Sequence, residues 1–127
     1  MTAEDIFGRI RGLHSTTAAN TFKLEKWHSL IFPKKHNSSK ITVEEFLDLF
    51  NTSLKWFKKA HSLDRDSCYP MILFDNLPKG GASQIHFHIH GLLANQYLSI
   101  VKIQEDAAHN YKTLHKRNYW TDIIEIH

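Results

Sequence analysis

The chain has 127 residues, of which 42% are apolar and 23% charged, a composition typical of one globular domain spanning residues 1–127. Its longest wholly apolar run, residues 71–74, is far shorter than the roughly 20 residues of a membrane span. The single cysteine, Cys68, excludes a disulfide framework and a multi-cysteine zinc site. The first ten residues lack the pattern of a signal peptide. We therefore expect a cytoplasmic protein without a membrane partner, with the nucleus as the alternative compartment.

The net charge is +3 with neutral histidines, and the excess is local. Residues 1–40 contain seven lysines and arginines against three acids, whereas residues 41–127 contain nine against ten. A positive field of this kind can attract a phosphate or a nucleic acid, but a solvated basic surface is the simpler interpretation. No specific nucleic-acid-binding motif accompanies it. The unusual count is that of histidine, which occurs ten times.

The first third of the chain predicts a short helix and one buried strand. Apolar residues recur at helical spacing over residues 3–13. The small polar residues 15–21 are compatible with a loop or a strand. The sequence WHSLIF, residues 27–32, predicts a buried strand that ends at Pro33 and is followed by a basic loop.

The clearest predicted helix covers residues 43–61. Thr42 and Glu45 have the spacing of a capping box, which marks a helix start. Apolar residues then recur at spacings of four and three and predict one buried stripe. The stripe consists of Val43, Leu47, Phe50, Leu54 and Phe57.

The remaining residues predict two strands and a second helix. Residues 69–76 predict a strand, residues 77–83 a glycine-containing loop, and residues 84–93 a strand with alternating apolar side chains. A helix is expected over about residues 100–116, and a terminal strand or turn over residues 119–127. Together these elements predict the α+β class.

Three histidines, His86, His88 and His90, stand at every second position of the strand predicted over residues 84–93. On a strand this spacing places the imidazoles on one face and the intervening Ile85, Phe87 and Ile89 on the other. Because the apolar residues require the core, we expect the imidazoles to face a groove. No demand of packing produces such a row, so we interpret it as a functional site.

Two chemical interpretations of the row remain open at this point. The imidazoles could bind a metal ion with help from Asp75 or His36, but alternate strand residues lie roughly 6.5–7 Å apart, which makes a three-histidine site on one straight strand difficult. Alternatively, the histidines could act in turn on a phosphate, because a neutral imidazole nitrogen is a nucleophile at physiological pH.

The loop before the histidines favours the phosphate interpretation. Lys79 supplies a positive charge, Ser83 supplies a hydroxyl group, and Gly80 and Gly81 allow backbone N–H groups to approach an anion closely. A metal site gains nothing from a cationic, glycine-rich neighbour. The sequence therefore predicts a phosphate site without a metal or another cofactor.

The sequence GASQIHFHIH, residues 81–90, resembles the signature of the histidine triad (HIT) superfamily, in which three histidines alternate with apolar residues. Its lead-in is most similar to the branch that contains galactose-1-phosphate uridylyltransferase and the diadenosine tetraphosphate phosphorylases. The sequence LIFPKKHN, residues 30–37, is similar to the strand and turn of HIT proteins. The resemblance covers about residues 20–93 and implies an antiparallel sheet with helices packed on it.

The resemblance also implies a role for each site residue. His88 would be the nucleophile that accepts a nucleoside monophosphoryl group, His86 would orient the site through the neighbouring backbone, and His90 would contact the α-phosphate and assist the leaving group. The expected substrate is a nucleotide, and a homodimer is expected because HIT proteins are often dimers. The residues expected to contact the substrate or support the site are Ser83, Asn76, Lys79, Gly81, Gln84 and His36.

Three departures from the family pattern keep an alternative function open. His90 matches the hydrolases, whereas the transferase branch usually has glutamine there, and Gly91 stands where an apolar residue is expected. Only 26 residues precede the strand at Trp27, so part of the nucleobase pocket is expected to be missing or supplied by another subunit. The first hypothesis is a nucleotidyl hydrolase or transferase, and the second is a weakly active or inactive nucleotide-binding or interaction domain.

Overall fold

The computed structural model describes residues 4–75, 78–81 and 84–126. The chain divides into two compact units, Met1–Asn95 and Gln96–His127, and each is described by itself. Among the described residues, no helix has the length and apolar character needed to cross a membrane.

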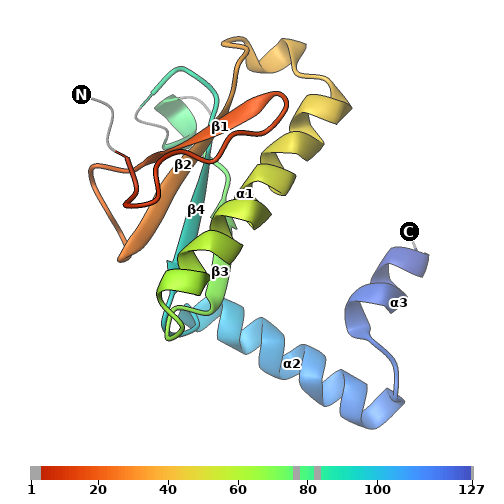
Figure 1. The fold of residues 1–127 in the computed structure, drawn as a ribbon. Helices are drawn as coiled ribbons and strands as arrows, with labels where there is room; N and C mark the ends of the chain where they lie inside the picture. Colours follow the sequence, from red (N-terminus) through yellow and green to blue (C-terminus); the bar gives the residue numbers. More distant parts are fainter. Residues whose placement is uncertain (1–3, 76–77, 82–83, 127) are drawn as a thin grey trace. The chain divides into compact units, whose positions relative to one another are not determined.

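The first unit contains a four-stranded antiparallel sheet (Figure 1). Its strands are β1 (Ser15–Ala19), β2 (Trp27–Pro33), β3 (Tyr69–Leu73) and β4 (Ile89–Ala94), in the spatial order β1-β2-β4-β3. The predicted α+β class with an antiparallel sheet is therefore confirmed. β2 and β4 are the two central strands and pair directly, with Leu30 opposite His90.

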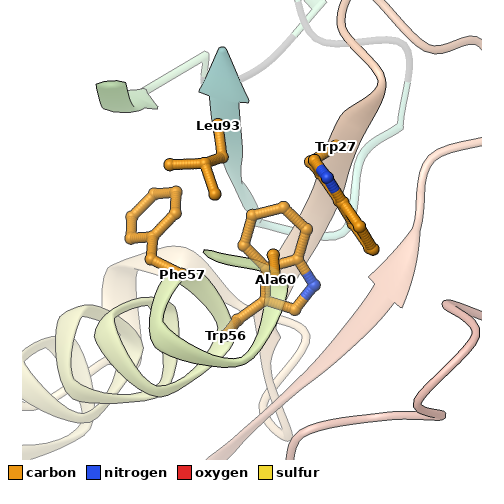
Figure 2. Close-up of a cluster of buried hydrophobic side chains, with 5 residues drawn as sticks. All are labelled: Trp27, Trp56, Phe57, Ala60 and Leu93. Carbon is orange, nitrogen blue, oxygen red and sulfur yellow. The ribbon is translucent and has the colours of Figure 1, made fainter. Parts of the chain in front are cut away.

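Helix α1 (Val43–Leu63) packs against β1, β2 and β4. The predicted capping box is present, because Thr42 accepts from the Glu45 backbone N–H and Glu45 accepts from the Thr42 backbone N–H. The core between helix and sheet has two clusters. Figure 2 shows the first, which consists of Trp27, Trp56, Phe57, Ala60 and Leu93. The second consists of Ile31, Leu49, Phe87 and Ile89.

The stripe predicted to be the buried face of α1 is largely exposed. Val43 is 77% exposed and Leu47 55%, and Leu54 is also exposed, whereas Phe57 alone of the predicted stripe is buried. The helix instead buries the face that contains Leu49, Thr52, Ser53, Trp56 and Ala60. Both faces have spacings of three and four, and burial of the large indole of Trp56 beside the small Ala60 favours the observed one. The prediction of a single buried stripe was wrong because α1 has two faces with the same spacing, and the one predicted is not the one that packs on the sheet.

Residues 4–12 do not form the predicted helix. They run in an irregular path in which Phe7 stacks on Trp27, with ring centroids 5.9 Å apart, and Asp5 accepts a hydrogen bond of 2.7 Å from the Trp56 indole. Gly8 has a φ of 73°, which is incompatible with a helix. Tertiary contacts with the two tryptophans therefore override the local helical spacing.

The strand boundaries also differ from the prediction. Of the two structures left open for the polar stretch after residue 14, the strand is the one formed, as β1. The strand predicted over residues 69–76 ends at Leu73. The strand predicted from residue 84 begins only at Ile89. Gly91 faces the core, where a Cβ atom would lie 3.0 Å from Ile31 Cδ1, so the absence of a side chain makes room for its neighbours. Short 3-10 turns occupy Ser38–Lys40 and Pro78–Gly80.

The second unit consists of helices α2 (Ser99–His115) and α3 (Tyr119–Ile126). The predicted helix near residue 100 is confirmed, but the predicted terminal strand or turn is a helix. Tyr111 donates to Asp122, and Arg117 forms ion pairs with Asp122 and Glu125, which connects the two helices. Neither helix buries a residue.

Candidate functional site

The three histidines lie at and before the start of β4. His90 belongs to the strand, whereas His86 and His88 precede it in a segment outside the ladder. Phe87 and Ile89 are buried in the core as expected, but Ile85 is 79% exposed, so the alternation begins later than predicted. His86 and His90 are half-buried, whereas His88 is only 4% exposed. The central imidazole is therefore more enclosed than a groove-facing residue was expected to be.

The hydrogen bond of His88 determines which of its nitrogens is free. Its Nδ1 lies 2.8 Å from the backbone carbonyl oxygen of His86. A carbonyl oxygen only accepts, so Nδ1 must carry the proton and donate. In the neutral ring the lone pair then resides on Nε2. His88 is thus held in the tautomer in which Nε2 is a nucleophile.

The ring of His86 is held from two sides. Its Nε2 donates to the backbone carbonyl oxygen of Pro33 over 3.0 Å, and its Nδ1 lies 2.6 Å from Nδ1 of His36. The edge of the ring also contacts Phe32, with centroids 5.9 Å apart. The structure therefore brings His36 to the histidine row, but its contact is with His86.

His90 is oriented by a histidine that the sequence analysis missed. His28 lies in β2, fully buried, with its Nε2 2.9 Å from Nδ1 of His90. The backbone N–H of Leu24 donates to His28 Nδ1 over 3.1 Å, so the proton of His28 resides on Nε2. The Asn20 amide nitrogen Nδ2 also lies 3.1 Å from this nitrogen, but its lone pair is delocalised into the amide and does not accept a proton, so His90 Nδ1 is the acceptor.

This arrangement assigns the proton of His90 to Nε2, where it can be donated to a ligand oxygen. The sequence signal for His28 was its position between Trp27 and Ser29 in a strand that was expected to be buried. That signal identifies a buried polar group that needs a partner. It cannot identify the partner, because the pairing of β2 with β4 is a tertiary property.

The environment keeps both histidines of this pair uncharged near neutral pH. Burial, reinforced by the neighbouring His90, lowers the pKa of His28 to about 4. Burial and His88 also lower the pKa of His90, and the nearby Asp75 opposes this effect. A neutral imidazole has one donor and one acceptor nitrogen. In His28 the contacts make Nδ1 the acceptor, from Leu24, and Nε2 the donor, to His90.

The depressed pKa of His28 predicts that stability falls as the pH falls from about 6.5 to about 4. In this range the unfolded chain, with a histidine pKa near 6.5, binds a proton that the folded protein does not bind. One such group changes the free energy of unfolding by at most about 1.4 kcal/mol per pH unit. Urea unfolding between pH 7 and pH 4.5 measures the slope, and His28→Gln is expected to flatten it. Equal slopes for the two proteins would contradict the assignment.

The other predicted site residues are only partly described. Lys79, Gly81 and Gln84 are exposed, and Gly81 has a φ of 98°, a conformation that glycine adopts without strain. In the described contacts, no hydrogen bond joins these three residues to the histidine row. Asn76 and Ser83 lie outside the described residues.

The alternative of a metal site finds no ligand set in the part of the chain that is described. No group of three or more histidine, cysteine, aspartate or glutamate side chains in residues 4–75, 78–81 and 84–126 could hold a metal ion. Both ring nitrogens of His86 contact protein groups, so His86 offers no nitrogen to a metal. The arrangement instead presents two neighbouring groups of opposite character, a lone pair on His88 Nε2 and a proton on His90 Nε2.

No family model matches the chain, and no curated protein matches it either. Solved structures do match. A HIT family protein from Bacillus subtilis is similar with a TM-score of 0.60, 19% identity, and coverage of 92% of this chain and 88% of that chain. A HIT family hydrolase from Legionella pneumophila gives a TM-score of 0.53, 21% identity, and coverage of 70% and 81%. A histidine triad nucleotide-binding protein from Candida albicans gives a TM-score of 0.55, 17% identity, and coverage of 84% and 87%. The fold of this chain is thus that of HIT family proteins.

Proposed function

We propose that this protein is a HIT-type nucleotide hydrolase or nucleotidyltransferase that works through a covalent nucleotidyl intermediate on His88. The substrate would be a dinucleoside polyphosphate, a nucleotide sugar or a nucleoside phosphoramidate. The observation that carries the proposal is the hydrogen bond from His88 Nδ1 to the His86 carbonyl oxygen, because it leaves Nε2 with a lone pair. The likeness in fold to HIT proteins, including one described as a hydrolase and one as nucleotide-binding, supports it.

In the first step His88 Nε2 attacks the α-phosphorus, forming an N–P bond and breaking the bond from phosphorus to the leaving group. A phosphate or sugar-phosphate group departs as an anion, whereas the amine of a phosphoramidate departs as it takes up a proton from solvent. The phosphorylated ring keeps its Nδ1 proton and becomes cationic, so charge balances in both cases. The Nε2–H group of His90 donates to a phosphoryl or leaving-group oxygen. Attack on the phosphorus by water, which releases a proton to solvent, or by an anionic phosphate acceptor in a transferase then breaks the N–P bond. The bonding electron pair returns to Nε2 and restores neutral His88.

The remaining residues of the site are assigned from the chemistry of the glycine-containing loop and from the resemblance to HIT proteins. Lys79, Gly81 and Gln84 would contact the phosphates from the exposed turn before the histidine row. Ser83 would bond the phosphate or the leaving group, and Asn76 the ribose or the phosphate. The reaction as proposed uses no cofactor or metal ion. The family branch near galactose-1-phosphate uridylyltransferase is part of this proposal, and it would favour transfer over hydrolysis.

Intact-mass analysis after incubation with dinucleotides, nucleotide sugars and phosphoramidates tests this function. We expect one substrate of the panel to give a protein adduct equal in mass to a nucleoside monophosphoryl group. The identity of the adduct reports the base, and the released product distinguishes water from phosphate as the acceptor. Turnover without any adduct in rapid-quench samples would contradict the covalent mechanism.

The alternative function is nucleotide binding with little or no turnover. It is favoured by the near-complete burial of His88, since a nucleophile that is 4% exposed must become more accessible before it reaches phosphorus. Equilibrium dialysis with the same nucleotides separates the two functions. Binding without product formation would replace the enzyme with a nucleotide-binding domain.

We also propose the homodimer implied by the resemblance, with the exposed stripe of α1 at the interface. Val43, Leu47 and Leu54 lie on this stripe, and the exposed Leu13 lines the same hollow as Val43 and Leu47. Such a patch on the surface is typical of an interaction site. Leu47→Glu is expected to halve the mass measured by analytical ultracentrifugation, whereas Lys59→Glu, an exposed position elsewhere on α1, leaves it unchanged. A monomeric unmodified protein would contradict the dimer.

A further inference from the structure

We propose that Asp75 is the counter-ion of the histidine row, a positioning residue whose carboxylate stabilises the positive charge that His88 acquires when it carries the nucleotidyl group. The inference rests on the proposed function, because the cationic ring is the intermediate described there. Asp75 was expected only as a possible ligand of a metal ion, for which the described residues offer no site. The basis of the new role is the face of the sheet on which Asp75 lies.

Asp75 lies two residues beyond the end of β3, on the side of the sheet opposite α1. Ile72 packs against both core clusters, so it faces the helix. Phe74 faces the same way, because its ring centroid lies 6.1 Å from that of Phe46 on α1 and 5.3 Å from that of the buried Phe87. Side chains alternate between the two faces of an extended chain. The Asp75 side chain therefore points away from α1.

The register of β3 and β4 brings Asp75 to the imidazoles. Leu73 is the ladder partner of His90, so the same register continued for two residues sets Asp75 opposite His88. The rings of His88 and His90 are neighbours, with centroids 5.1 Å apart. The electrostatics agree with this placement, because burial and His88 lower the pKa of His90 whereas the charge of Asp75 raises it.

No lysine or arginine forms an ion pair with Asp75 in the part of the chain that the structure describes. The other ionisable groups that face His90 are His28, which bonds to it from β2, and His88, which contacts its ring. Burial lowers the pKa of both His28 and His90, so neither supplies a positive charge near neutral pH. The charge of Asp75 is therefore available to a cation that forms on the row.

Formation of the nucleotidyl intermediate supplies this cation. When Nε2 of His88 forms the N–P bond and Nδ1 keeps its proton, the ring carries one positive charge, and no proton moves to Asp75. The Asp75 side chain is half-buried, and opposite charges attract more strongly there than in bulk water because the effective dielectric constant is lower. Asp75 thus favours the cationic ring and, with it, the attack on phosphorus.

NMR titration of the imidazoles in the free protein tests whether Asp75 faces the row. Asp75→Asn removes the charge and keeps the shape of the side chain, so we expect the pKa of His90 to fall. In Asp75→Glu, which restores the charge, the pKa should return toward its original value. Asp66→Asn is the matched control, at an exposed aspartate in the turn before β3, and should leave the pKa of His90 unchanged. An unchanged pKa in Asp75→Asn would overturn the proposal.

Single-turnover kinetics on a substrate identified by the adduct experiment give the second measurement. Asp75→Asn is expected to slow adduct formation about tenfold, which corresponds to about 1.4 kcal/mol, and Asp75→Glu should restore most of the rate. An unchanged rate with weaker nucleotide binding would identify Asp75 as a substrate ligand, and a faster rate would show that its charge repels the phosphate. Either result would overturn the inference and leave the proposed enzyme intact. Because the titration needs no turnover, a lowered pKa of His90 in a protein that forms no adduct would support the placement of Asp75 while contradicting the proposed enzyme.

Discussion

Replacement of His88 by asparagine is expected to abolish both adduct formation and turnover, a loss on the order of 10⁴-fold or more if His88 is the nucleophile. Asparagine can keep the hydrogen bond to the His86 carbonyl, because its amide nitrogen takes the place of Nδ1. It cannot form an N–P bond through an Nε2 lone pair. The measurement is intact mass together with product formation under single-turnover conditions.

The choice of asparagine follows from the burial of His88. Since the ring is 4% exposed, alanine would remove packing and leave the His86 carbonyl without its donor, so His88→Ala combines a chemical and a structural change. Urea unfolding of both variants separates the two contributions. His86→Asn and His90→Asn serve as comparisons at the outer positions. An adduct that persists in His88→Asn but disappears in one of these comparisons would mean that a different histidine is the nucleophile.

The largest effect on stability is expected from Gly12→Ala, at about 3 kcal/mol. A Cβ atom at Gly12 would collide with Thr52 Oγ1 and Asp48 Oδ2 on α1 and would lie 2.8 Å from Ser15 Oγ. These atoms cannot move freely. Asp48 accepts from the His14 backbone N–H at 2.9 Å and from Ser15 Oγ at 2.6 Å, and Ser15 Oγ lies 2.8 Å from Thr52 Oγ1. The free energy of unfolding in urea measures the loss.

Gly80→Ala is the matched control for this substitution, because a Cβ atom there meets nothing within 4 Å. The unfolding free energy of the control should stay within about 0.5 kcal/mol of that of the unmodified protein. A Gly12→Ala protein as stable as the control would show that the turn before β1 can separate from α1 without cost. Activity in Gly12→Ala, measured well below its unfolding midpoint, should be retained, since no hydrogen bond among the described residues joins this turn to a histidine of the row.

The elements that could be predicted from the sequence are those with strong local signals. The capping box of Thr42 and Glu45 located the start of α1, and the compact apolar run of residues 27–32 located β2. The alternation around His88 and His90 identified Phe87 and Ile89 as core residues. Each of these signals depends on neighbours within a few positions, for which chain geometry leaves few alternatives.

The errors occur where distant residues compete with local preference. The helix expected over residues 3–13 is replaced by contacts of Asp5 and Phe7 with two tryptophans. On α1, two apolar stripes satisfy the same periodicity, and only the fit against the sheet selects the one with Trp56. The end of the chain forms α3, whose polar residues Asp122 and Glu125 bond to Arg117. Periodicity alone does not identify such partners.

The histidine site divides in the same way. The sequence by itself determined which three histidines stand at alternate positions and which glycine-rich turn precedes them, because alternation and turn chemistry are local. Only the tertiary structure decided which ring nitrogen of each histidine carries the proton. His28 and His36 act on the row through hydrogen bonds across 62 and 50 positions of the chain, and the lone pairs follow from those bonds. An imidazole presents one donor and one acceptor, and which nitrogen is which depends on a partner that only the folded chain brings within reach.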